Sequence, residues 1–253
     1  MNEPSVLYLD NHLLVIGKPA GFLSQGDHSG DDDVISWSKN YLKKAFSKPG
    51  NVYAGLVHRL DRPVSGVMVV ARTSKAASRL TAQWKNRTPV KRYLAIVEGH
   101  LDSPGEMKDC IAKKDQKVRV VSPSHPAGKK ALLSFNPVWS KNGMTAVDIS
   151  LKTGRPHQIR VQFSSRGFPL LGDFRYGATR RFDGKNLALH SYSLTFEHPV
   201  KKEEMNFTWG SPLQVWSKLL PGFKGRAHLK QTVIHLHPEP NQFEWNGCEF
   251  QDR

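Results

Sequence analysis

The chain has 253 residues, enough for one domain with a large core or for two small domains. Its 37 Lys and Arg against 22 Asp and Glu give a formal net charge of +15, and the basic surplus lies between residues 34 and 220, which favours a polyanionic partner such as RNA. The sequence has two distant cysteines, no apolar run long enough to span a membrane and no signal-peptide pattern, so we expect a cytoplasmic protein without a disulfide framework.

The first 45 residues predict a hairpin followed by a helix. Apolar residues at 6–9 and 13–16 flank a turn at Asp10-Asn11, as in a β-hairpin. The acidic run 31–33 then caps a helix. The apolar face that we expect on this helix consists of Val34, Trp37, Tyr41, Leu42 and Ala45.

The apolar run 67–71 predicts a buried strand, and a second helix follows it. We expect Ser74 to cap this helix. Lys75 and Arg79 share another face, which we expect to be solvated. The inward residues of the helix are expected to be Ala77, Leu80, Thr81 and Trp84.

The second half of the chain predicts further strands and one more helix. Strand patterns occur at 93–97 and 144–151, and a helix is expected over 158–166, with Pro156 in its first turn and Gly167 at its end. Strands and helices are mixed without a regular βαβ repeat, which predicts an α+β fold with a largely antiparallel central sheet and flanking helices.

A charge-neutral extension of unassigned role follows the predicted catalytic domain. We expect the domain to cover 1–220 and the extension 221–253. His235 and His237 share a strand face but lack a third ligand nearby, and Cys110 and Cys248 lie far apart in the sequence, so we expect no metal site.

One short segment carries the clearest chemical signal. Asp61 is a lone carboxylate among His58, Arg59 and Arg62, and it precedes Gly66 and the buried run. A nearby cation keeps such a carboxylate ionised, and an ionised Asp can act as a nucleophile. The alternative is a carboxylate that only stabilises a turn.

The motifs along the chain resemble those of the RluA-type pseudouridine synthases. They occur in family order between residues 6 and 212. A departure is Val64, where the family more often has Thr. The residues before the first motif are too few for an S4-type RNA-binding domain. The matching segments are Lys18-Pro19-Ala20-Gly21, His58–Gly66, Lys91–Gly99, Thr153–Arg160, Gly167–Asp173 with Tyr176-Gly177, and Leu187–His190 with Leu194, Phe196, His198 and Pro199.

The resemblance implies a pseudouridine synthase fold with a basic active-site cleft, and it implies roles for individual residues. Asp61 is the catalytic nucleophile, Tyr93 stacks on the target base or moves a proton, and Arg160 pairs with Asp61. Arg155 is the alternative partner for Asp61. Gly172-Asp173 reads as a turn, to which we assign no catalysis.

The remaining site residues are expected to contact RNA. For Arg59, a hydrogen bond that stabilises the loop is an equal alternative. The expected RNA-binding residues are His58, Arg59, Arg62, Arg155 and His157, and the expected apolar wall against the uracil is Leu187 and Leu189.

The expected function is isomerisation of specific uridines in rRNA or tRNA by a monomer that needs no cofactor, metal or membrane. The reaction involves no redox step and no net group transfer. Two alternatives are a catalytically silent RNA-binding or ribosome-assembly factor and a glycosylase that releases the base. The sequence does not identify the RNA.

Overall fold

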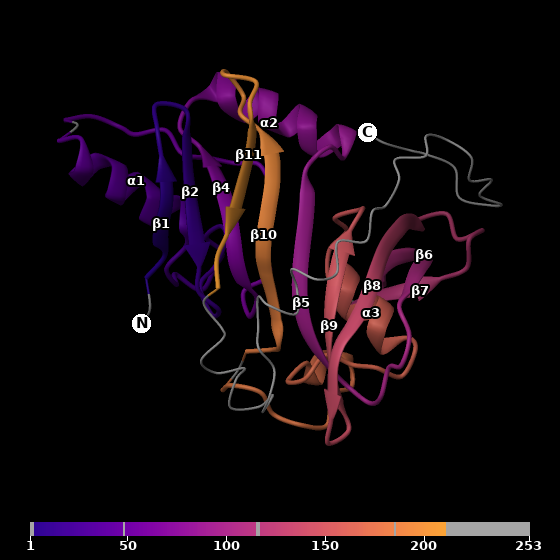
Figure 1. The fold of residues 1–253 in the computed structure, drawn as a ribbon. Coiled ribbons are helices and arrows are strands. Elements are labelled where there is room, and N and C mark those ends of the chain that lie inside the picture. Colours follow the sequence, from indigo (N-terminus) through magenta and orange to yellow (C-terminus); the bar gives the residue numbers. More distant parts are fainter. Residues whose placement is uncertain (1–2, 48, 115–116, 185, 211–253) are drawn as a thin grey trace. The chain divides into compact units, whose positions relative to one another are not determined.

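The structure is a computed structural model that describes residues 3–47, 49–114, 117–184 and 186–210 (Figure 1). The predicted extension at 221–253, including Cys248, His235 and His237, lies outside the described residues. The chain divides into two compact units. The first consists of residues 1–94 and 181–211, and the second contains residues 95–180.

The first unit contains a mixed parallel and antiparallel sheet and two helices. Its strands follow the order β1-β2-β4-β10, with β11 on β10 and β3 on β4 (Figure 1). The pairing of β10 with β4 is parallel, and the other pairings given for this unit are antiparallel. The elements are β1 Ser5–Leu9, β2 Leu13–Lys18, α1 Val34–Ala45, β3 Gly55–Leu56, β4 Ser65–Ala71, α2 Ser74–Asn86, β10 Leu189–Glu197 and β11 Glu204–Thr208, and β5 (Val90–Glu98) begins here and continues into the second unit.

The predicted hairpin and buried strand are confirmed. Antiparallel pairing joins β1 to β2, and β4 is buried along almost its whole length. The core of the unit lies between these strands and α2, where strand residues such as Leu13 and Val67 meet Ala76 and Leu80 of the helix. A rigid core strand therefore follows directly after the Asp61 segment.

Helix α1 begins as expected, but only Val34 and Leu42 of the five residues expected on its apolar face are buried, while Trp37 and Tyr41 are half-buried. Asp33 caps the helix by accepting hydrogen bonds from the backbone N–H groups of the next turn. The buried residues are Val34, Ser38 and Leu42, because the buried stripe follows the i, i+4 row. Ala45, which we expected on this face, lies exposed in the last turn.

The N-cap of helix α2 lies one residue earlier than the sequence predicts. Thr73, not Ser74, is the N-cap: its backbone is extended, and its hydroxyl accepts the N–H of Ala76 at 3.1 Å. The expectation of an inward Thr81 is also wrong, since Thr81 is exposed and Ala76 is buried with Leu80. Two adjacent hydroxyl residues offer the same capping chemistry, so spacing alone does not separate them.

The second unit is an antiparallel sheet with one short helix. Its strands follow the order β9-β8-β6-β7, and α3 packs against them through Val161, which meets Ile111, Val118 and Ala131. The elements are β6 Gly105–Lys114, β7 Lys117–Val121, β8 Lys129–Lys141, β9 Met144–Leu151, α3 Gln158–Ser164 and the 3-10 helix η1 Phe174–Tyr176. The mixed, mostly antiparallel sheet with few helices confirms the predicted fold class.

Helix α3 is shorter than the predicted span of 158–166. It starts at Gln158 as expected and ends at Ser164, but Pro156 is not in its first turn, because Pro156 and His157 form a turn before the helix and His157 has a left-handed backbone (φ 51°). Gly167 ends the helical region as expected, with φ +82°. Every residue from Gln158 to Phe163 is buried, so the helix is a core element that carries Arg160.

Candidate active site

Asp61 lies on a loop that is tied to the chain on both sides. The backbone carbonyl of Asp61 accepts the N–H of Val64 at 3.0 Å. The hydroxyl of Ser24 donates to the carbonyl of Leu60 at 2.6 Å and accepts the N–H of Leu60 at 3.1 Å. Val64, the departure from the family pattern, is buried. These bonds fix the backbone that presents the carboxylate.

Lys18 supports the same loop from the interior. Its ammonium donates to the carbonyls of Phe22 at 2.7 Å, Pro19 at 3.0 Å and Arg62 at 3.3 Å. The side chain is fully buried, and burial lowers the pKa of Lys18 to about 7, although the nearby charge of Asp61 opposes this shift. The sequence motif contains Lys18 but does not predict this role, because contacts across 44 residues leave no local pattern.

Gly66 allows the end of the loop to approach β10 closely. It pairs with Ser191 in the parallel register and has φ +146°. A Cβ at position 66 would lie 2.4 Å from Cβ of Ser191 and 2.5 Å from its carbonyl oxygen. Only glycine fits such a position.

His190 fixes the neighbouring residue of the same pairing. Its Nδ1 lies 2.9 Å from the hydroxyl of Ser65, and its Nε2 lies 2.7 Å from the carbonyl oxygen of Trp209. A carbonyl only accepts, so Nε2 carries the proton and Ser65 donates to Nδ1. Burial lowers the pKa of His190 to about 4, so the ring is neutral at neutral pH.

Tyr93 is a buried phenol that stays protonated. Burial is the main cause that raises the pKa of Tyr93 to about 12. A hydrogen bond from Ser191 lowers the pKa, and the charge of Asp61 raises it. The phenol is therefore protonated at neutral pH, and it belongs to the first unit together with Asp61.

Arg160 belongs to the second unit and is held by a partner that the sequence analysis did not assign. Its Nε donates to Oδ2 of Asp173 at 2.6 Å, and its Nη2 donates to Oδ1 at 2.8 Å. Asp173 also forms the predicted turn, since its N–H bonds to the carbonyl of Leu170. The predicted pairing of Arg160 with Asp61 stays a prediction.

Two of the residues predicted to bind RNA have structural contacts in the first unit. Nε2 of His58 accepts the N–H of Val69 at 3.1 Å, and its ring stacks on Trp84. Burial lowers the pKa of His58 to about 3, so the ring is neutral. The guanidinium of Arg62 pairs with Asp31 at 2.8 Å. Arg59 is exposed beside them.

In the second unit, the two other predicted RNA-binding residues contact nearby groups. Nε of Arg155 donates to the carbonyl of Lys130 at 3.1 Å. Nδ1 of His157 lies 2.8 Å from the hydroxyl of Tyr176. Their contact with RNA stays a prediction.

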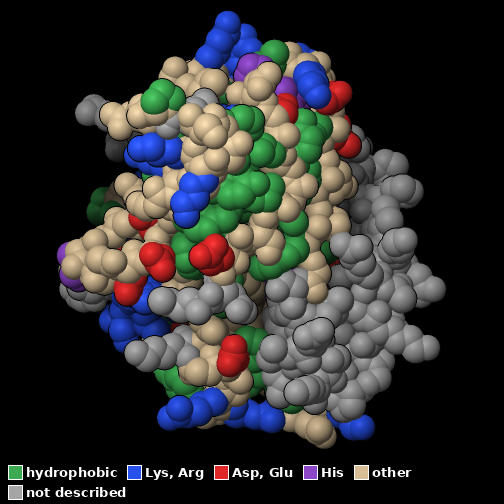
Figure 2. Space-filling model, turned by 90° about the vertical axis from the view of Figure 1, so that its left-hand side faces the viewer, with side chains coloured by type: hydrophobic (Ala, Val, Ile, Leu, Met, Phe, Trp, Pro, Cys, Tyr) green, Lys and Arg blue, Asp and Glu red, His purple; other side chains and the backbone are tan. Residues whose placement is uncertain are grey.

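Leu187 and Leu189, predicted as the wall of a base pocket, are both buried where β10 begins. Figure 2 shows one face of the molecule, where hydrophobic side chains form a group and Lys and Arg side chains lie around it. The predicted basic cleft stays a prediction.

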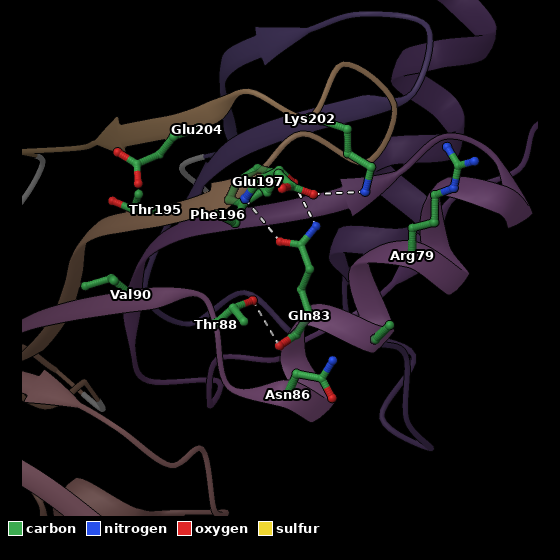
Figure 3. Close-up of a pocket in the computed structure, with 11 residues that line it drawn as sticks. Arg79, Gln83, Asn86, Thr88, Val90, Thr195, Phe196, Glu197, Lys202 and Glu204 are labelled. Atoms are coloured by element: carbon green, nitrogen blue, oxygen red, sulfur yellow. Dashed lines mark hydrogen bonds and ion pairs between the residues drawn. The ribbon is translucent and has the colours of Figure 1, made fainter. Parts of the chain in front are cut away.

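A pocket of about 530 Å³ lies elsewhere in the first unit, between α2 and the β10–β11 pair (Figure 3). Gln83 crosses it and bonds through its amide to both the carbonyl and the N–H of Glu197. Arg79, expected on a solvated face, donates to the carbonyl of Pro199 at 2.8 Å. The lining includes none of the predicted site residues, so this pocket adds nothing to the site around Asp61.

Two features are absent from the part of the chain that the structure describes. No group of three His, Cys, Asp or Glu side chains there is placed to hold a metal ion. None of the helices described is long and apolar enough to cross a membrane.

The fold is that of a pseudouridine synthase. The human protein "RNA Pseudouridylate Synthase Domain Containing 4" has a similar structure, with a TM-score of 0.70 and 24% identity over 85% of this chain and 91% of that chain. This likeness shows the shared architecture.

Sequence comparison identifies the family. The family model described as RNA pseudouridylate synthase matches residues 12–165. The chain is 32% identical over 239 residues to "Ribosomal large subunit pseudouridine synthase D" of Zymomonas mobilis, covering 87% of this chain and 75% of that protein. It is 38% identical over 226 residues to "Uncharacterized RNA pseudouridine synthase YjbO" of Bacillus subtilis, covering 86% and 75%. The chain belongs to the RNA pseudouridine synthases of the RluA family and is therefore an isomerase.

Proposed function

We propose that this enzyme isomerises uridines of large-subunit ribosomal RNA, with Asp61 as its nucleophile. The observation that carries the assignment of Asp61 is its loop, held by Ser24 and Lys18 next to a buried, protonated Tyr93. A fixed carboxylate beside a neutral phenol supplies a nucleophile and a proton donor in one site. The choice of RNA follows the similarity to the Zymomonas enzyme, whose name states its ribosomal target.

The reaction defines what these groups must do. The bond between C1′ and N1 breaks, a bond between C1′ and C5 forms, C5 loses a proton and N1 gains one. The carboxylate of Asp61 attacks either the sugar or the base to allow the uracil to turn. Tyr93 lies against the base and takes part in the proton movement, and Arg160 holds negative charge in place. The bonds and protons that are lost at one atom of the nucleotide are gained at another atom of the same nucleotide, so the reaction is an isomerisation.

The target base must leave its stack before this chemistry. Unstacking costs a few kcal/mol, and basic contacts with phosphates offset this cost. We assign these contacts to Arg59, Arg62 and Arg155, together with His58 and His157. The predicted wall of Leu187 and Leu189 lies against the uracil in this proposal.

The test uses total RNA from a strain that lacks the gene. The protein and an Asp61→Asn variant are incubated with this RNA, and pseudouridines are mapped in ribosomal and transfer RNA separately. New pseudouridine in large-subunit rRNA, absent with the variant, is the expected result. Pseudouridine only in tRNA would overturn the choice of RNA. Turnover by a verified Asp61→Asn protein, free of deamidation, would overturn the role of Asp61.

The same experiment separates the enzyme from a silent binding factor. Asp61→Asn removes the negative charge but keeps the basic surface, so RNA affinity should stay while turnover is lost. Tight RNA binding by wild-type protein without any new pseudouridine would instead favour the silent ribosome-assembly factor. Free uracil in the products would identify a glycosylase.

A further inference from the structure

The second unit contains a buried ion pair that the proposed chemistry does not yet use. Asp173 binds Arg160 through two parallel hydrogen bonds of 2.6 and 2.8 Å. The two side chains are 1% and 7% exposed. A bidentate pair of this kind fixes both the position and the plane of a guanidinium.

The surroundings hold Asp173 itself in place. Its N–H donates to the carbonyl of Leu170 at 2.9 Å, and its carbonyl accepts the N–H groups of Tyr176 and Ala178. The guanidinium of Arg160 lies over the ring of Tyr176, 5.0 Å from the ring centre. The carboxylate is therefore attached to a rigid turn, and the arginine is held at one edge by this carboxylate and on one face by an aromatic ring.

We propose that Asp173 is a positioning residue, which fixes the guanidinium of Arg160 for its part in the isomerisation. This inference rests on the proposed role of Arg160. Arginine has a long side chain with considerable rotamer freedom, and part of that freedom is removed before RNA binds. A guanidinium that must act at one place during the reaction works best when its position is fixed beforehand. Small misplacements of reacting groups lower the reaction rate strongly.

The turn directly after this helix offers a matched control. Arg166 follows Arg160 by six residues, and its two Nη atoms donate to the carboxylate of Asp109 at 3.0 and 3.1 Å. This second pair is more exposed, at 36% and 11%. Asp109→Asn therefore removes a carboxylate from an arginine near the end of α3 without touching Arg160.

The test compares four proteins on total RNA from the deletion strain: wild type, Asp173→Asn, Asp173→Glu and Asp109→Asn. The single-turnover rate of pseudouridine formation, the Kd for RNA and the unfolding midpoint are measured for each. Asp173→Glu keeps the negative charge but moves the carboxylate by one methylene. It therefore tests the position of the carboxylate even if Asp173→Asn does not fold. We expect both Asp173 variants that fold to lose about 10²-fold in rate with unchanged Kd. Asp109→Asn should keep the wild-type rate.

An Asp173→Glu protein that folds and keeps the wild-type rate would overturn the inference. So would a loss of rate that is equal in Asp109→Asn, because disturbance of α3 would then explain both results. A loss of RNA affinity without a change in rate would likewise contradict positioning for the reaction.

A double-mutant cycle distinguishes failure of this inference from failure of the proposed role of Arg160. Arg160→Met alone should lose turnover. If Asp173 acts only through Arg160, then adding Asp173→Asn to Arg160→Met should cause no further loss. Full turnover by Arg160→Met would overturn the role of Arg160 and the inference with it, whereas additive losses would overturn the inference alone. Because total RNA is used, the test does not depend on which RNA is the target.

Discussion

Gly66→Ala is expected to be severely destabilising, and its cost can be worked from two features. The first is the backbone, whose φ of +146° is unfavourable for any side chain and costs about 1–3 kcal/mol. The second is space, since the new Cβ would lie 2.4 Å from Cβ of Ser191 and 2.5 Å from its carbonyl oxygen. Overpacking of this kind costs about 1–3 kcal/mol. Together they predict a loss of about 2–6 kcal/mol, a large part of the roughly 5–15 kcal/mol that stabilises a typical domain.

Urea denaturation followed by circular dichroism measures this loss, with Gly30→Ala as the control. Gly30 has φ +72° and no atom within 4 Å of its added Cβ, so only backbone strain applies there. A double variant with Ser191→Gly should recover only part of the loss, because the carbonyl oxygen at 2.5 Å stays in place. A Gly66→Ala protein as stable as Gly30→Ala, or one fully rescued by Ser191→Gly, would refute this reasoning.

Three further predictions concern the interior of the first unit. Lys18→Met should lose about 1–3 kcal/mol of unfolding free energy for each carbonyl left without a donor, whereas Lys39→Met on an exposed face of α1 should change little in the same urea titration. Burial lowers the pKa values of His58 and His190 to about 3 and about 4, so only the unfolded state takes up these protons as the pH falls below about 6.5. Between pH 7.5 and 5 the two rings should together cost about 4 kcal/mol of stability, and a His58→Gln variant that loses no less than wild type would contradict this. Because burial raises the pKa of Tyr93 to about 12, the single-turnover rate should show no loss from Tyr93 ionisation up to pH 9, and Tyr93→Phe should keep RNA affinity while losing turnover.

Local patterns predicted most of the elements of this chain. The hairpin at 6–16, the buried strand after Gly66 and the cap at Asp33 each depend on neighbours within a few residues, and the structure contains all three. The errors are also local: a cap displaced from Ser74 to Thr73, and a helix that ends at Ser164 instead of Arg166 and leaves Pro156 in the turn before it. Thr73 and Ser74 offer the same hydroxyl, and the left-handed backbone of His157 separates Pro156 from the helix, so backbone angles decide both boundaries.

The candidate site was predictable only where a motif names its residues. Asp61, Tyr93 and Arg160 follow from the family resemblance, but their contacts do not. Asp173 lies 13 residues after Arg160, and its glycine-rich context predicts only a turn. Lys18 meets the loop across 44 residues, a separation that no periodicity reveals. Buried polar contacts of this kind arise from the tertiary fold, which places a donor against an acceptor.

The pKa shifts support the proposed chemistry in the first unit. The described groups with the largest pKa shifts are Lys18, His58, Lys91, Tyr93 and His190. All of them belong to the first unit, and burial is the leading cause of the shift in each. Strongly shifted groups cluster at functional sites, because a medium of low polarity strengthens each remaining charge. Burial keeps the histidines and Tyr93 neutral at neutral pH, and the charge of Asp61 contributes to the pKa shifts of Lys18 and Tyr93.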